Sequence, residues 1–230
     1  MKTIGLLGGM SWNSTADYYR LINEGVARRL GGLHSAKIIL HSFDFDEIEQ
    51  LQSGGLWAEA AVKLSEAAGS LKSAGAEFLV IATNTMHKVA DEVESASGLP
   101  MLHIAESAGE SVKKMGLKKV GLLGTRFTMS EGFYSSRLTE KFGIEVLVPD
   151  ANEQQIINSI IYDELCRGCI QDASRWACQL IIENLVSRGA EGIVLACTEL
   201  PLLIKQSDVM VPVFDTSRLH VTAAVARALA

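Results

Sequence analysis

A thiol and an alcohol occupy matching positions at the ends of two apolar segments. Cys197 directly follows the apolar residues 193–196, and Thr83 directly follows residues 78–82. Apolar runs without alternation predict buried parallel strands, and open α/β sheets bind ligands at the carboxyl ends of such strands. A helix is expected to begin at Thr198. Its amides and dipole would ease ionisation of the thiol. The alternative is a small buried cysteine that packs like an alanine.

The two positions belong to an internal repeat. Thr83 and Cys197 lie 114 positions apart, and two further pairs of segments recur in the same order at spacings of 116 and 112. These pairs are residues 4–9 with 120–125, and residues 100–103 with 212–215. The chain therefore reads as two related halves that would approach one ligand from opposite sides of a cleft.

Predicted strands alternate with predicted helices throughout, which is typical of an α/β fold with parallel sheets and helices on both faces. We expect two pseudo-symmetric, doubly wound domains with the active site in the cleft between them. The first comprises residues 1–104 and 216–230 and carries Thr83. The second comprises residues 105–215 and carries Cys197.

Several segments have a specific local prediction. Residues 43–50 are expected to lead into an irregular stretch that ends at Gly54 and Gly55, and residues 124–129 to form a loop. Helices are expected over residues 85–95 and 152–166, in addition to the one that begins at Thr198.

Composition narrows the classes of partner. The 230 residues carry a formal net charge of −6 and no basic run, which argues against a nucleic-acid surface. No apolar run is long enough to span a bilayer, and the first apolar segment reads as a strand and not as a signal peptide. We therefore expect a cytoplasmic protein with reduced cysteines and no membrane partner.

Two other patterns resemble cofactor motifs without matching them. Gly5, Gly8 and Gly9 do not have the spacing of a dinucleotide fingerprint, so we expect them to let backbone amides approach a small anion. Cys166 and Cys169 have C-x-x-C spacing but no second ligand pair, so we interpret them as packing residues, with a redox role as the lesser alternative. Neither a cofactor nor a metal is expected.

Four polar residues near the strand ends have two interpretations each. His87 could bind a ligand or satisfy a neighbouring group. His103 and Asp215, at repeat-equivalent strand ends, could orient the cleft residues or join the halves. Glu199 is either an acid that favours a helix N-terminus or a partner of Cys197.

Taken together, the motifs resemble the aspartate/glutamate racemase family. The likeness spans the whole chain and is carried by residues 6–12, 82–87, 123–125 and 196–200. It implies two pseudo-symmetric α/β domains, a small amino-acid substrate, a homodimer, and catalysis without pyridoxal phosphate or a metal.

The family mechanism uses one cysteine on each face of the substrate's α-carbon. Cys197 matches the second of these cysteines, whereas Thr83 stands where most members have the first. A thiol has an unperturbed pKa of about 8.5, but an alcohol has no comparable accessible anion. The resemblance therefore implies an asymmetric racemase in which Cys197 is the main acid/base. The likeness is greatest to members specific for L-enantiomers, so the L-form is the expected preference.

The resemblance also implies substrate contacts around the two strand ends. Arg126 is the one cation within these motifs, and Glu164 stands in a region that carries a substrate-binding lysine in some members. The implied binding residues are Met10, Gln52, Asn84, Thr85, Thr125, Thr198 and Glu199.

Two other functions are compatible with the sequence. Decarboxylases or isomerases of the same superfamily need one cysteine, for example to protonate the intermediate formed from a malonate-type substrate. An amino-acid-binding protein that has lost a base would need none. Solvent-proton exchange at an amino acid's α-carbon distinguishes the racemase from both.

Overall fold

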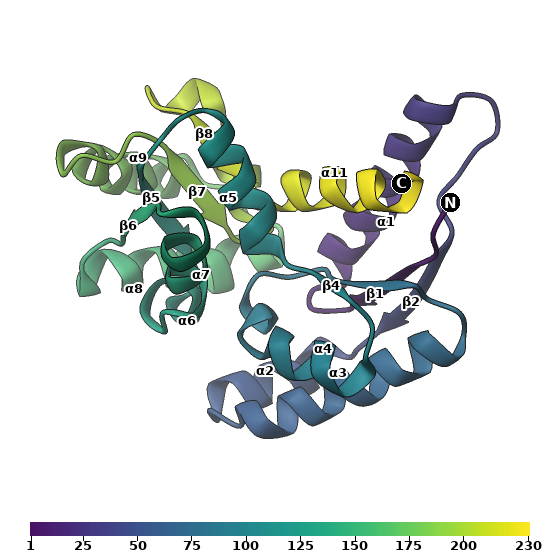
Figure 1. Cartoon of the computed structure of the whole chain (residues 1–230). Coiled ribbons are helices and arrows are strands. Elements are labelled where there is room, and N and C mark those ends of the chain that lie inside the picture. The colour runs from purple at the N-terminus through teal and green to yellow at the C-terminus, as the bar shows by residue number, and fades with distance from the viewer. The chain divides into compact units, whose positions relative to one another are not determined.

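The computed structural model describes residues 1–230, and the chain divides into two compact units. Unit 1 contains residues 1–104 and 220–230, and unit 2 contains residues 105–219. Each unit holds a four-stranded parallel sheet flanked by helices (Figure 1). No helix in the chain combines the length and the apolar character needed to cross a membrane.

Unit 1 has the strand order β2-β1-β3-β4. Its elements are β1 (Ile4–Gly8), α1 (Trp12–Leu30), β2 (Ile38–Ser42), α2 (Phe45–Ser53), α3 (Trp57–Ser73), β3 (Phe78–Ile81), the 3₁₀ helix η1 (Thr85–Val89), α4 (Ala90–Ser97), β4 (Met101–Leu102) and most of α11 (Thr216–Leu229).

Unit 2 has the equivalent order β6-β5-β7-β8. Its elements are α5 (Ile104–Lys114), β5 (Lys119–Gly124), α6 (Arg126–Ser130), α7 (Phe133–Phe142), β6 (Glu145–Leu147), α8 (Ala151–Ser159), the π-helix η2 (Ile160–Glu164), the 3₁₀ helix η3 (Leu165–Arg167), α9 (Asp172–Ser187), β7 (Ile193–Ala196), α10 (Leu200–Leu203), the 3₁₀ helix η4 (Gln206–Asp208) and β8 (Val213–Asp215). It also takes in the first turn of α11, whose Thr216 hydroxyl donates to the Leu195 carbonyl.

The repeat extends to the register of the strands. Leu7 pairs with Ile81 in unit 1, and Leu123 pairs with Leu195 in unit 2. Leu7 and Leu123 lie 116 positions apart, and Ile81 and Leu195 lie 114 positions apart, which are the spacings of the repeated sequence motifs. Thr83 and Cys197 therefore leave their sheets at equivalent points, and the predicted α/β class with two parallel sheets is confirmed.

The central strands are fully apolar because helices cover both of their faces. All four residues of β3 and all four of β7 are buried. In unit 1, the face covered by α1 and α11 forms one core cluster and the face covered by α3 forms another. Such strands offer no polar surface along their length, which confines polar chemistry to the loops at their ends.

Four local predictions were wrong. Residues 45–53 and 126–130 form helices where irregular structure was expected, because Asp44 and Thr125 cap them. The expected helix 152–166 changes to π and 3₁₀ geometry from Ile160 onward. The helix after Cys197 has only four residues and begins at Leu200, not at Thr198.

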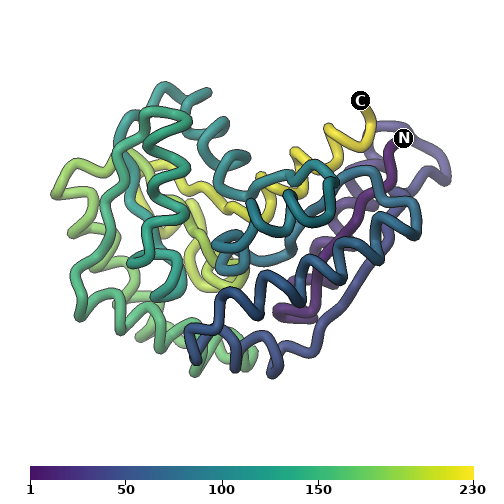
Figure 2. Tube along the Cα trace, turned by 60° about the horizontal axis from the view of Figure 1, so that its bottom comes forward, coloured from purple at the N-terminus to yellow at the C-terminus, as the bar shows by residue number.

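The two chain ends meet in unit 1. The Lys2 amide donates to the Ala228 carbonyl at 2.7 Å, and α1 approaches α11 so closely that a Cβ on Gly25 would lie 2.8 Å from Val225. Figures 1 and 2 show α11 returning to the N-terminal strand.

A buried histidine fastens α11 to the rest of unit 1. The His220 Nε2 lies 2.8 Å from the Leu102 carbonyl, which only accepts, so Nε2 carries the proton. Its Nδ1 therefore accepts from the Tyr18 hydroxyl at 3.0 Å. Burial lowers the pKa of His220 from 6.5 to about 4, because the charged ring would lose its hydration.

This lowered pKa predicts a loss of stability in acid. Between pH 6.5 and pH 4 the unfolded chain binds a proton at His220 that the folded chain does not, so the free energy of unfolding should fall as pH falls. The full contribution is about 3 kcal/mol. Urea unfolding across this range should show a flatter pH dependence for His220→Gln, whose amide can still donate to Leu102. The exposed His34→Gln is the control, and an unchanged slope in His220→Gln would contradict the assignment.

Candidate active site

Cys197 lies immediately beyond β7, where it is 5% exposed. Its Sγ donates to Glu199 Oε2 at 3.2 Å, and the Thr198 hydroxyl donates to the same oxygen at 2.5 Å. Of the two interpretations of Glu199, the geometry supports a partner of Cys197. The three consecutive residues thus form a compact group in which one carboxylate oxygen accepts from a thiol and an alcohol.

The thiol is held in its protonated form. Burial raises the pKa of Cys197 well above its usual value, and the nearby Glu199 charge raises it further. The Glu199 amide, at the start of α10, lowers the pKa of Cys197 as expected for this strand end. Burial and the Glu199 carboxylate outweigh that effect, so the net shift is opposite to the expected easing of ionisation.

Thr83 lies two residues beyond β3 and is 9% exposed. Its carbonyl accepts from the Nδ1 of His87 at 2.7 Å, and the His87 Nε2 accepts from the Ile104 amide at 3.2 Å. Both ring nitrogens of His87 are thus used by the backbone of unit 1. Of its two interpretations, the structure supports satisfaction of neighbouring groups.

His103 packs edge-on against the same ring, with centroids 4.6 Å apart, and His87 also packs against His220 at 5.5 Å. The three histidines form a contiguous buried cluster in the interior of unit 1. Sequence analysis missed His220 because its partners are distant in the chain, and no local motif surrounds it.

The other residues expected to bind substrate divide between the units. In unit 1, Asn84 and Thr85 are buried next to Thr83. Met10 belongs to the hydrophobic core against α3, and the Gln52 amide, on helix α2, donates to the sulfur of Met86 at 3.0 Å.

In unit 2, Thr125 acts as a helix cap. Its hydroxyl accepts from the Thr128 amide at 3.4 Å at the start of α6. Arg126 is exposed, and its guanidinium lies 5.2 Å from the ring of Phe127. Glu164 accepts from the Ser174 hydroxyl at 2.6 Å.

Close packing requires glycine in the first loop. The Gly9 amide donates to the Thr15 hydroxyl, and a Cβ on Gly9 would lie 2.2 Å from the carbonyl oxygen of Phe43. Gly8 likewise leaves no space beside Thr15. The Gly9 amide, one of those expected to approach an anion, is therefore already bonded inside the unit.

The remaining cysteines are free thiols. Burial raises the pKa of both Cys166 and Cys178 to about 12, and Cys169 is exposed. Cys166 shares a core cluster with Cys197, at its edge. At the end of β8, Asp215 accepts from the Arg218 amide, and burial raises its pKa.

Comparisons with known proteins agree with the fold and the motifs. The family model described as Asp/Glu/Hydantoin racemase matches residues 7–224. The broad-specificity amino-acid racemase RacX of Bacillus subtilis is 30% identical over 230 residues, covering 93% of this chain and 92% of RacX.

Two solved structures match over the full length of both chains. A candidate Asp/Glu racemase from Yersinia pestis is 56% identical with a TM-score of 0.95. An aspartate racemase homologue from Pyrococcus horikoshii is 38% identical with a TM-score of 0.85. The chain therefore belongs to the Asp/Glu/hydantoin racemase family, and its enzyme class is that of the amino-acid racemases, which are isomerases.

Proposed function

We propose that the protein is a cofactor-independent racemase of aspartate and glutamate in which Cys197 transfers the α-proton. The observation that carries this proposal is the hydrogen bond from the Cys197 thiol to Glu199, at a strand end equivalent to that of Thr83. Membership of the racemase family supports the reaction class, and the aspartate racemase homologue from Pyrococcus horikoshii supports the choice of acidic substrates.

The Cys197–Glu199 pair can supply the base that the reaction needs. The thiol first passes its proton to the Glu199 carboxylate along the existing hydrogen bond, and a thiolate remains. The thiolate then takes the substrate's α-proton: the C–H bond breaks, an S–H bond forms, and the electron pair stays on the carbon next to the carboxylate. The positive ammonium group of the substrate favours the thiolate at this moment.

Thr83 accounts for an asymmetric rate. It is proposed to serve the opposite face of the α-carbon, where its hydroxyl, or a water that it holds, returns a proton as an O–H bond breaks and a C–H bond forms. An alcohol is a poor carbon base, so removal of a proton from this face is slow. The enzyme then exchanges the α-proton faster for the enantiomer that presents it to Cys197, which we assign as L, whereas inversion in both directions is limited by the Thr83 side.

Polar groups beside the two strand ends are proposed to hold the substrate. The side chains of Asn84 and Thr85 and the backbone amide of Thr198 would donate to its α-carboxylate. Met10, Gln52 and Thr125 would line the substrate site. The exposed Arg126 is the cation that would pair with the substrate's side-chain carboxylate.

Solvent exchange tests the proposed reaction. In D₂O the protein should replace the α-proton of L-aspartate or L-glutamate by deuterium, and chiral chromatography should detect the D-enantiomer. Cys197→Ser should lower the exchange rate at least about 100-fold, whereas the exposed Cys169→Ser should not. Exchange that survives in Cys197→Ser would refute the role of Cys197. Release of carbon dioxide from a disubstituted malonate, without α-exchange of an amino acid, would assign the chain to the decarboxylases instead.

Glu199→Gln should separate thiol ionisation from catalysis. Removing the negative charge lowers the pKa of Cys197, so alkylation of Cys197 by iodoacetamide, followed by peptide mass spectrometry, should be faster at neutral pH. Racemisation should nevertheless fall about 100-fold, because the amide cannot accept the thiol proton. The exposed Glu183→Gln is the matched control. If kcat rises together with the alkylation rate, Glu199 is not the proton acceptor.

Thr83→Cys should make the enzyme more symmetric. A thiol on this side can form an anion, so exchange of the α-proton with solvent should become faster from the D-enantiomer relative to exchange from the L-enantiomer. Thr83→Ser keeps the alcohol and should leave the ratio of proton-exchange rates, measured separately from each enantiomer, close to that of the parent. If that ratio is the same in Thr83→Cys as in the parent, Thr83 does not face the α-carbon.

A further inference from the structure

The Thr198 hydroxyl and the Cys197 thiol share one acceptor. Thr198 Oγ1 donates to Glu199 Oε2 at 2.5 Å, and Cys197 Sγ donates to the same oxygen at 3.2 Å. The first distance lies at the short end of the range for a hydroxyl that donates to a carboxylate, and such bonds are stronger than those between neutral groups. A thiol, by contrast, is a weak donor. The alcohol therefore contributes more than the thiol to the position of this oxygen.

The Glu199 side chain gains order from this bond. Glu199 is half-buried, so its carboxylate could also turn toward water. Although the residue directly precedes α10, its side chain makes no capping hydrogen bond to that helix. Ordering a glutamate costs conformational entropy, because its side-chain torsions are otherwise mobile. The bond from Thr198 offsets this cost in the conformation that places the carboxylate beside the thiol.

The effect of Glu199 on two thiols shows which way its carboxylate points. Its charge raises the pKa of Cys166 as well as that of Cys197, and Cys166 packs against the core cluster that contains Cys197. A carboxylate turned out into solvent would be screened and would have little effect on buried groups. The conformation that Thr198 stabilises is therefore the one in which Glu199 acts on the thiols.

We propose that the Thr198 hydroxyl positions Glu199 for the reaction, by holding Oε2 where it accepts the proton of Cys197. This role rests on the proposed function, in which that transfer creates the thiolate. It differs from substrate binding, which the proposed function assigns to the backbone amide of Thr198. A hydroxyl has one proton to donate, and this one is already donated to Glu199.

Alkylation of Cys197 tests the role without any substrate. Thr198→Val keeps the branched shape of the side chain and removes the hydroxyl, so Glu199 should turn away and the pKa of Cys197 should fall toward its usual value. Iodoacetamide at neutral pH should then alkylate Cys197 at least about threefold faster than in the parent, as peptide mass spectrometry would measure. Thr198→Ser retains the hydroxyl and should keep the parent rate.

A double variant shows whether the two residues act as one unit. Because the hydroxyl acts through the carboxylate, Thr198→Val should change the alkylation rate of Glu199→Gln by less than about twofold. Effects of the two substitutions that multiply would overturn the proposal. So would an alkylation rate in Thr198→Val that is equal to or below that of the parent.

Steady-state kinetics separates positioning from substrate binding. Racemisation by Thr198→Val should show a kcat about tenfold lower and a KM within about twofold of the parent, because the amide of residue 198 is retained. A raised KM at an unchanged kcat would show instead that the hydroxyl binds the substrate, and would overturn the proposal.

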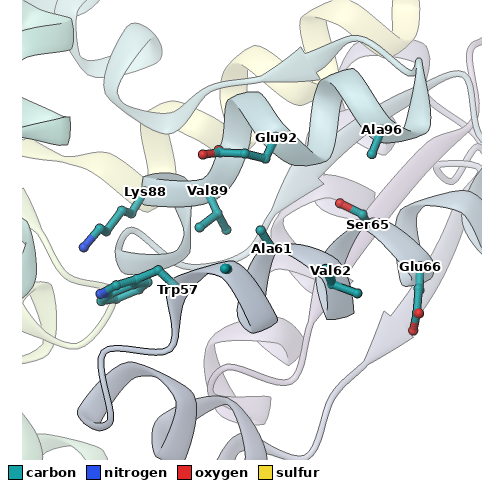
Figure 3. A pocket seen from close by; sticks show the side chains of 10 residues that line it. Trp57, Ala61, Val62, Ser65, Glu66, Lys88, Val89, Glu92 and Ala96 are labelled. Carbon is teal, nitrogen blue, oxygen red and sulfur yellow. The ribbon is translucent and has the colours of Figure 1, made fainter.

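Two controls remove hydroxyl groups elsewhere. Thr139→Val removes one that donates to the Ile144 carbonyl at 2.9 Å in unit 2. Ser65→Ala removes one from the lining of an open groove of about 600 Å³ between α3 and α4 in unit 1 (Figure 3). Both should keep the parent alkylation rate, and circular dichroism should show that every variant is folded. Failure of the alkylation tests would overturn the role of Thr198 and leave the proposed reaction intact, whereas a parent without α-exchange would refute the reaction itself.

Discussion

Parallel pairing of fully buried central strands is the constraint on which this structure depends. β3 and β7 are apolar on both faces, so neither can carry a polar side chain within the sheet. Thr83 and Cys197 lie two residues and one residue, respectively, beyond the last paired residue of their strands. The strands of the two sheets pair in the same register, so Thr83 and Cys197 lie at equivalent points of their units. This equivalence does not require the two residues to be in contact.

The same burial decides the protonation of the thiol. A cysteine shielded from water favours its neutral form, and a carboxylate at 3.2 Å strengthens that preference. A permanently ionised thiol would be ready as a base but unable to act as an acid. In the proposed reaction, a thiol that exchanges its proton with Glu199 would serve in both directions, as a reversible proton transfer at carbon demands.

The pattern of elements could be read from the sequence because it rests on local signals. Apolar runs, glycine and proline breaks, and the spacings of 112 to 116 between repeated motifs predicted the parallel sheets and the equivalence of Thr83 with Cys197. The short helices over 45–53 and 126–130 were missed because their caps, Asp44 and Thr125, lie in segments that looked like loops. The pKa of Cys197 was misjudged because desolvation depends on the packing around the thiol, which no local pattern reports. The tautomer of His220 likewise depends on the Leu102 carbonyl, which is 118 residues away in the chain.

The path of the chain through unit 1 determines when each unit can be completed. Residues 1–104 form most of unit 1, but the unit also needs α11, whose Val221, Ala224, Val225 and Ala228 complete the core against α1. During synthesis these residues leave the ribosome after all of unit 2 has emerged. The later half of the chain can therefore reach its native packing first, which inverts the usual order in which domains mature from the N-terminus. Until then the apolar face of α1 lacks its cover, so the newly made N-terminal half exposes apolar surface that favours aggregation.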